Sequence, residues 1–268
     1  MARIAQFVSL LGLVASVVSA TRPIASVSAI RHSGRTVGRE VVNADNTVDR
    51  MSCAVTLYVT GKRSDTAVLY LTDVFGIQLP ENKLLADSFG RAGYLTVAPD
   101  MFNGTPAPAD INASPDFNVT EFLYEHRPEI VDPVIASAIR YMRTQLRVKR
   151  IGVTGYCFGG RLTFRTLTEG SGVEAGFAAH PSFAENDEIV NISGPLALAA
   201  AENDDLLPTE RRHEYEELLR SSGQPYYVSL YSGTSHGFGV RANVSDPVQR
   251  FGKEQAFFQA VRWFDTWV

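Results

Sequence analysis

The sequence predicts an α/β domain with a mostly parallel central sheet and helices on both faces. Short apolar runs rich in β-branched residues alternate with longer stretches whose apolar residues recur at helical spacing. That alternation is typical of strands joined by crossover helices, which make a sheet parallel and cover both of its faces. The chain has 268 residues and is 45% apolar, which is enough for one sizeable core.

Seven runs are expected as strands, namely residues 54–59, 67–72, 94–98, 150–154, 175–179, 196–201 and 226–231. Helices are expected between most of them, over residues 81–92, 119–146, 161–167 and 209–221, with a last one near 248–267. Pro128 and Pro133 are expected to bend the second helix, because proline removes a helix hydrogen bond. No linker divides residues 51–268, which we interpret as one domain. Residues 21–50, rich in small and polar types, are interpreted as an N-terminal surface leader.

The charge balance limits the classes of partner that this chain can bind. A formal charge of −4 and an isoelectric point near 5.8 leave no basic stripe for nucleic acid or an anionic membrane. No glycine-rich phosphate loop precedes a Lys-Ser/Thr pair, and no clustered His/Cys spacing indicates a metal site. The sequence therefore indicates a small-molecule partner without a metal or organic cofactor, and it indicates no particular oligomeric state.

Residues 1–20, "MARIAQFVSLLGLVASVVSA", have the pattern of a secretory signal peptide. Arg3 supplies the basic start, residues 4–18 the uncharged apolar stretch, and Ser19 and Ala20 the small residues before a cleavage site after Ala20. The alternatives are a membrane anchor, for which the stretch is short, and a mitochondrial presequence, which would be richer in arginine. A secreted protein with no membrane attachment after cleavage is the expectation.

Glycosylation sequons agree with a secreted protein. The chain has five Asn-x-Ser/Thr sequons, and the one at Asn112-Ala-Ser114 is weakened by the proline that follows it. Several sequons behind a signal peptide predict a glycoprotein. The four unhindered sequons begin at Asn103, Asn118, Asn191 and Asn243.

Cys157 and Cys53 are the two cysteines, and a disulfide between them is the ordinary interpretation for a secreted chain. The surroundings of Cys157 favour another role. In "RIGVTGYCFGGRLTF" a strand-like run reaches Gly155-x-Cys157-x-Gly159 and leads into a helix, which is the pattern of a nucleophile elbow with cysteine in place of serine. Glycines are needed because side chains beside so sharp a turn would collide with other backbone. The elbow sets the thiol at a helix N-terminus, where the dipole favours a thiolate.

An elbow nucleophile needs a base and a carboxylate that follow it in the chain. His32 and His126 precede Cys157 and are excluded by chain order. His213 lies in a polar helix whose charged neighbours account for a histidine there, and His180 stands at the end of a strand. His236, in the glycine-flanked loop "TSHGFG" after the last strand, is the best candidate base.

The carboxylate is expected in "LALAAAENDDLLP", where a buried strand ends in acidic residues. A carboxylate bonded to the second imidazole nitrogen would fix the tautomer of the base and stabilise the imidazolium. Spacing alone does not choose among Glu202, Asp204 and Asp205, and Asp204 or Asp205 would serve.

"GYCFGGR", "AHPSF", "ENDDLLP" and "SHGF", with "DVFG" and "PDMF" upstream, resemble the dienelactone hydrolase family of α/β-hydrolases, particularly its fungal branch. The resemblance runs from about residue 50 to the C-terminus and implies the α/β-hydrolase fold. It implies that the family's Cys, Asp and His are Cys157, Asp204 and His236. Asp204 is preferred because it stands four residues before Pro208, as the family's acid stands before its proline.

The resemblance also assigns the segment "LYLTDVFG". Val74 takes the place whose backbone N–H joins that of Phe158 in an oxyanion hole. Asp73 takes the place of a family glutamate that contacts the cysteine, and a carboxylate there would disfavour a resting thiolate. The alternative for Asp73 is a turn cap before Gly76.

Three residues, His180, Phe238 and Arg241, are candidates for the substrate pocket. Family members that hydrolyse dienelactone hold its carboxylate with arginines. This chain has Asn103 and Gly104 at one such place, and Arg241 lies one step from the other. The resemblance therefore implies the reaction class and does not extend to dienelactone as the substrate.

The sequence thus predicts a hydrolase of a small ester or lactone that works through a covalent acyl-enzyme on Cys157. Two alternatives stay open. The fold could serve as a non-catalytic binding module, or the protein could be a redox protein with a Cys53–Cys157 bond.

Overall fold

The computed structural model describes residues 26–44, 54–111 and 113–268. Within them, eight strands form one sheet in the order β1-β2-β4-β3-β5-β6-β7-β8. The predicted signal peptide, Cys53 and Asn112 lie outside the described residues. The strands are β1 Arg39–Asn43, β2 Val55–Thr60, β3 Thr66–Leu71, β4 Leu95–Pro99, β5 Arg150–Tyr156, β6 Ala175–Ala179, β7 Leu196–Asn203 and β8 Tyr226–Ser235.

The sheet is parallel from β4 to β8, and only the pairs β1–β2 and β2–β4 are antiparallel. Strands such as β3, "TAVLYL", are buried along their whole length, as expected where helices cover both faces of a parallel sheet. The predicted fold class is confirmed. The carboxyl ends of β3, β5, β6, β7 and β8 consequently lie along one edge of the sheet, where the loops that follow them can meet.

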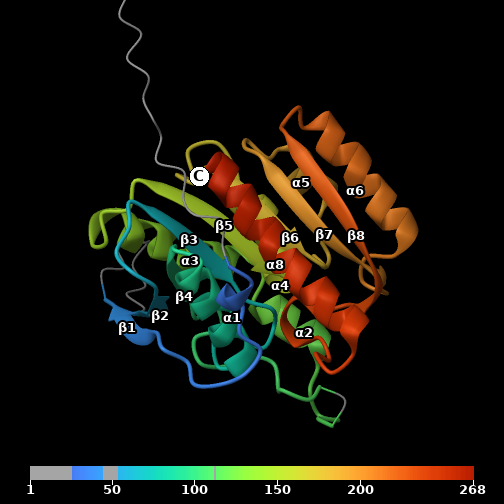
Figure 1. The fold of residues 1–268 in the computed structure, drawn as a ribbon, viewed down its shortest axis with the longest axis horizontal. Helices are drawn as coiled ribbons and strands as arrows, with labels where there is room; N and C mark the ends of the chain where they lie inside the picture. The colour runs from blue at the N-terminus through green and yellow to red at the C-terminus, as the bar shows by residue number, and fades with distance from the viewer. Residues whose placement is uncertain (1–25, 45–53, 112) are drawn as a thin grey trace, which may run out of the picture.

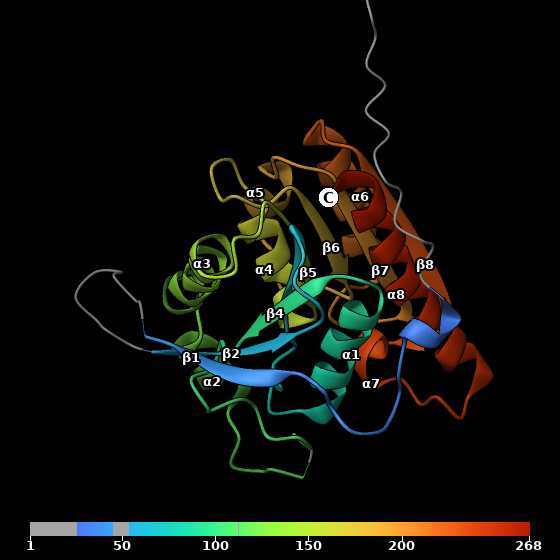
Figure 2. The same cartoon turned by 60° about the vertical axis from the view of Figure 1, so that its left-hand side comes forward.

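Helices cover the two faces in separate layers (Figures 1 and 2). On one face α1 and α8 pack through aromatic side chains, with the ring centroids of Phe89 and Phe257 5.0 Å apart. On the other face α3, α4 and α6 cover the sheet. The helices are η1 Val27–Ala29, α1 Pro80–Arg91, α2 Val119–Glu125, α3 Pro128–Thr144, α4 Phe158–Thr166, α5 Asn186–Val190, α6 Thr209–Ser221, α7 Phe238–Arg241 and α8 Pro247–Trp267. None of these helices is long and apolar enough to cross a membrane.

The stretch expected as one bent helix, residues 119–146, is two helices. Helix α2 ends at Glu125, and α3 begins at Pro128. Proline has no N–H to continue the first helix, but its fixed φ suits the first position of the next one. Pro133 lies inside α3, where a bend was expected.

Within the segment interpreted as an N-terminal leader, residues 21–50, the structure has strand β1, Arg39–Asn43. Five residues of β1 pair antiparallel with β2. The Gly38 N–H donates to the Tyr58 hydroxyl at 2.7 Å, and that hydroxyl donates to Asp87 Oδ1 at 2.9 Å. The other carboxylate oxygen of Asp87 accepts from the Val37 N–H at 2.8 Å. This buried relay ties the approach to β1 to helix α1.

We expect Tyr58→Phe to lower the free energy of unfolding by about 1–3 kcal/mol, because it leaves the buried partners of the hydroxyl unsatisfied. Chemical denaturation measures the change. Tyr227→Phe is the control, since the Tyr227 side chain is 51% exposed on β8. Equal stability of the two variants would contradict the relay.

Candidate active site

Cys157 occupies the turn between β5 and α4. Its backbone has φ 54° and ψ −113°, a conformation that a non-glycine residue adopts only under strain. The surroundings hold it there, since the Cys157 N–H donates to the Ala179 carbonyl at 3.1 Å and the Cys157 carbonyl accepts from the Gly160 N–H at 2.9 Å. The thiol is free and the residue 6% exposed.

The two glycines of the elbow have no room for a side chain. A Cβ on Gly155 would lie 1.9 Å from the Gly159 carbonyl oxygen, and a Cβ on Gly159 would lie 2.3 Å from the Leu71 carbonyl oxygen. Both contacts are far below van der Waals distance, and both involve backbone that cannot move aside. The Gly-x-Cys-x-Gly spacing is therefore a steric requirement of this turn.

His236 and Asp204 come together at the ends of β8 and β7. The Nδ1 atom of His236 lies 2.9 Å from both carboxylate oxygens of Asp204. The side chain of Asp204 is fully buried, and its Oδ1 also accepts from the N–H groups of Leu206 and Leu207 at 2.9 and 3.1 Å. Asp205, the other acid that the strand end offered, is exposed.

The environment of His236 favours the imidazolium. Burial lowers its pKa, but the hydrogen bond to Asp204 and the negative charge of Cys157 outweigh burial and raise the pKa to about 10. Its Nε2 has no hydrogen-bond partner among the described residues. Cys157 nevertheless raises the pKa of the ring through both hydrogen-bonding and charge interactions, so the thiol lies near the ring. Such bonds commonly tighten only when substrate binds.

Two backbone N–H groups beside the elbow have no acceptor among the described residues: those of Phe158 and Val74. Phe158 is the first residue of α4, where N–H groups lack intrahelical partners. Val74 lies in the turn after β3, and a hydrogen bond of 3.0 Å from the Gly159 N–H to the Thr72 carbonyl ties that segment to the start of α4. Both groups are free to donate to a bound oxygen.

Asp73 is fully buried and pairs with Arg241, whose Nε lies 3.3 Å from Asp73 Oδ2. Its Oδ1 accepts from Asn82 Nδ2 at 2.8 Å and from the Phe75 N–H at 3.2 Å. Burial raises the pKa of Asp73, although the bonds from Asn82 and Arg241 oppose the rise. The carboxylate thus caps its own turn, and the described hydrogen bonds join it to Arg241 and Asn82, not to Cys157. An influence of Asp73 on the thiol stays a prediction.

His180 and Phe238 lie behind His236 and not at an open surface. The two residues are 0% and 3% exposed, and a role for either in a substrate pocket stays a prediction. The ring centroids of His180 and His236 are 5.1 Å apart in an edge-to-face arrangement. Burial lowers the pKa of His180 well below 6.5. The neutral imidazole of His180 therefore packs against the imidazole of His236, which is hydrogen-bonded to Asp204.

Ser182 is a site residue that the sequence reasoning missed. Its hydroxyl lies 3.6 Å from Cys157 Sγ, and its N–H donates to the Cys157 carbonyl at 3.2 Å. The signal was available in "AHPSF", because the end of β6 lies beside the elbow in a parallel sheet. His180 and Phe183 in the same segment have φ of 36° and 57°, so strained backbone brings the hydroxyl to the thiol.

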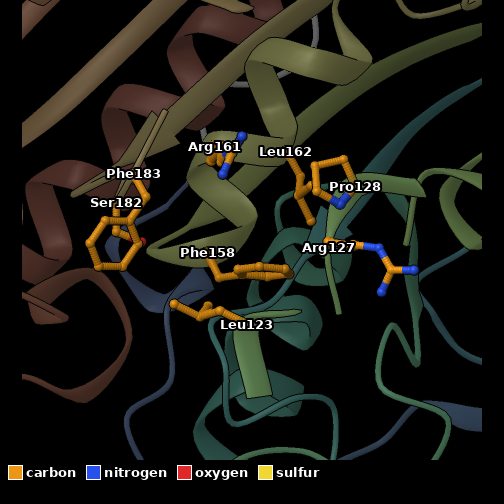
Figure 3. A pocket seen from close by; sticks show the side chains of 8 residues that line it. All are labelled: Leu123, Arg127, Pro128, Phe158, Arg161, Leu162, Ser182 and Phe183. Atoms are coloured by element: carbon orange, nitrogen blue, oxygen red, sulfur yellow. The ribbon is translucent and has the colours of Figure 1, made fainter. Parts of the chain in front are cut away.

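A cavity of about 110 Å³ adjoins the elbow (Figure 3). Its walls come from α2, the start of α3, α4 and the segment after β6. The described residues hold no group of three His, Cys, Asp or Glu side chains placed to bind a metal ion. The lining residues are Leu123, Arg127, Pro128, Phe158, Arg161, Leu162, Ser182 and Phe183.

Comparison with known proteins places the chain in a family. The model of the dienelactone hydrolase family matches residues 55–268. The chain belongs to the dienelactone hydrolase family. Membership makes it an enzyme, a hydrolase of ester or lactone bonds.

Relatives and solved structures agree with that assignment. The chain is 42% identical over 211 residues to hydrolase pyvD of Aspergillus violaceofuscus, covering 79% of this chain and 85% of the relative. It is 37% identical to hydrolase tropI of Talaromyces stipitatus, covering 89% and 93%. A carboxymethylenebutenolidase homolog of Mus musculus is 29% identical, covering 79% and 87%.

Among solved structures, a dienelactone hydrolase-like promiscuous phosphotriesterase from metagenomic libraries superposes with a TM-score of 0.65 at 15% identity, covering 87% of this chain and 99% of that one. A Pyrococcus furiosus esterase superposes with a TM-score of 0.59 at 16% identity, covering 85% and 93%. At these identities the likeness shows the fold alone, which is that of the α/β-hydrolases.

We expect the pKa of His236 to fall in Cys157→Ala, because the negative charge of Cys157 contributes to raising it. The folded-state pKa of His236 lies above the unfolded value of about 6.5. The interactions of His236 with Asp204 and Cys157 therefore stabilise the fold fully below about pH 6.5, and this stabilisation is lost as pH rises through about 10. Titration of the His236 ring by NMR measures the shift. An unchanged pKa would show that Asp204 alone sets the charge of the ring.

Proposed function

We propose that this hydrolase works by nucleophilic acyl transfer, with Cys157 as the nucleophile, His236 as the general acid and base, and Asp204 as the orienting carboxylate. The observation that carries the proposal is the 2.9 Å pairing of His236 with Asp204 beside a free thiol on a strained turn. Three groups from three separate loops have no structural reason to converge in this order. The free thiol supports this mechanism over a redox bond to Cys53.

In the proposed mechanism the Cys157 thiolate attacks the carbonyl carbon, and the N–H groups of Phe158 and Val74 stabilise the oxyanion. The imidazolium of His236 gives its Nε2 proton to the departing alkoxide, which leaves a thioester on Cys157. His236 then takes a proton from water, whose oxygen attacks the thioester and releases the acid. The thiolate leaves, and the proton on His236 restores the starting ion pair. Asp204 holds the Nδ1–H throughout and so fixes which nitrogen reacts.

The proposed substrate is a small ester or lactone other than dienelactone itself. The names of two relatives, dienlactone hydrolase 1 of Gibberella moniliformis and the carboxymethylenebutenolidase homolog of Mus musculus, describe dienelactone chemistry for those proteins. In this chain Asn103 is exposed, and Arg241 donates to Asp73. Neither position supports a site for the carboxylate of that lactone.

Replacing either reacting group tests the proposal. We expect Cys157→Ala and His236→Ala to lower kcat for an activated ester by ~10³-fold or more, because members of such a triad act as a unit. His213→Ala is the control, since His213 is exposed on α6, and we expect it to retain the wild-type rate. A wild-type rate in either of the first two variants would refute the mechanism.

We also propose that the protein is secreted and glycosylated, with the mature chain beginning at Thr21. Exposure of the sequon asparagines Asn103, Asn118, Asn191 and Asn243 supports this proposal. We expect glycosidase treatment of protein from the culture medium to increase its gel mobility, and N-terminal sequencing to begin at Thr21. Recovery of intact Met1 in cell-associated protein without glycan would contradict it.

A further inference from the structure

A cavity adjoins the turn that carries the proposed nucleophile, lined by Phe158, the residue after Cys157, and by Ser182. We propose that this cavity binds the acyl group of the substrate, and that the acyl group it accepts is compact, uncharged and apolar. The inference rests on the proposed acyl-transfer function and assigns the part of the substrate that the reaction leaves on Cys157.

The position of the cavity connects it to the reacting sulfur. Ser182 lines it, and the hydroxyl of Ser182 lies 3.6 Å from Cys157 Sγ. Phe158 also lines it and is the residue whose N–H is proposed to hold the oxyanion. A carbonyl carbon bonded to Sγ therefore has the cavity within reach of its next atoms.

The segments that form the walls indicate that the cavity holds the acyl group of the substrate and not its leaving group. The departing oxygen must receive its proton from Nε2 of His236, so the leaving group lies on the side of the loop after β8. No residue of that loop lines the cavity, whose walls come from residues 123–128, 158–162 and 182–183. The group that enters it is therefore the one that remains attached to Cys157.

The lining selects for an uncharged group. Leu123, Phe158 and Leu162 present apolar surface, with Phe158 in the centre of the view in Figure 3. The guanidinium of Arg161 is already held by the buried carboxylate of Glu188, with contacts of 2.8 to 3.0 Å.

The second arginine of the lining is also engaged. Arg127 donates to the Tyr124 carbonyl at 2.8 Å, pairs with Glu129 at 3.6 Å, and points away from the Phe158 ring in Figure 3. A carboxylate buried here would compete with existing partners and lose its hydration.

The size of the cavity selects for a compact group. Its volume of about 110 Å³ is somewhat smaller than the ~150 Å³ apolar cavity that takes up benzene. Phe183 lines it and is 49% exposed, so this ring stands at the opening. Its φ of 57° is costly for an aromatic residue and keeps the side chain at this place. Groups longer than the cavity must displace Phe183 or extend past it into solvent.

The test uses two ester series with the wild-type enzyme and three variants. The acyl series is p-nitrophenyl acetate through octanoate, with the p-nitrophenyl hemisuccinate as a charged match for the butyrate. The alcohol series is methyl through octyl butyrate. Leu123→Trp fills the cavity, Phe183→Ala opens its mouth, and Phe251→Ala is a matched control because Phe251 is 61% exposed on α8.

We expect the wild-type kcat/KM to peak at a short acyl chain and to be lower for the hemisuccinate than for the butyrate. Leu123→Trp should lower the butyrate-to-acetate ratio by about tenfold or more, the range in which pockets discriminate by one or two methylenes. Phe183→Ala should shift the optimum to longer acyl chains, and Phe251→Ala should match the wild type. The alcohol series should keep its profile in every variant.

A changed alcohol profile with an unchanged acyl profile would overturn the inference, because the cavity would then hold the leaving group. Unchanged profiles in both series for Phe183→Ala would overturn it as well; we expect this variant to fold, because the Phe183 side chain is half-exposed. A wild-type preference for the hemisuccinate over the butyrate would also overturn it. Failure of the proposed function looks different: the wild type would hydrolyse no ester in either series, or Cys157→Ala would hydrolyse them equally well.

Discussion

The turn at Cys157 is the constraint on which the rest of the site depends. A residue with a side chain is held at positive φ where β5 meets α4, and the turn closes only because Gly155 and Gly159 lack a Cβ. The same closeness that forbids side chains brings the start of α4 against the segment after β3 through the Gly159–Thr72 hydrogen bond. The thiol, the two free N–H groups and the helix terminus are thus fixed by one backbone conformation.

Around this turn the protein arranges charges in two buried pairs with different solvation. Asp204 is fully buried, accepts two loop N–H groups and holds His236, so a hydrogen-bonded carboxylate keeps the imidazolium charged. Asp73 is equally buried, but its cationic partner Arg241 is 36% exposed, and burial raises the pKa of Asp73. The two carboxylates are equally buried, whereas the cationic partner is 18% exposed in the first pair and 36% exposed in the second.

The parts of this picture that follow from local pattern could be predicted from the sequence. Strand-to-helix alternation gave the parallel sheet, and the glycine spacing around Cys157 indicated the elbow because its sterics are local. Strand β1 could not be predicted, since it is held by its pairing with β2 and the segment before it by a relay through Tyr58 and Asp87. The position of Ser182 and the burial of His180 depend likewise on which strands lie side by side. The choice of Asp204 over Asp205 rested on the resemblance, because their spacing is equivalent and only the folded structure separates them, by burial and by the contact of Asp204 with His236.

The chain order of the site has a consequence for how the protein acquires its activity. Cys157, Asp204 and His236 follow β5, β7 and β8, and β8 is the outermost strand of the parallel side of the sheet. Pairings between parallel strands are non-local and form slowly. A chain in which β8 has not docked would lack the His236–Asp204 pair, which is part of the proposed triad. Because β8 and His236 come late in the chain, the proposed acyl transfer depends on completing the parallel edge of the sheet.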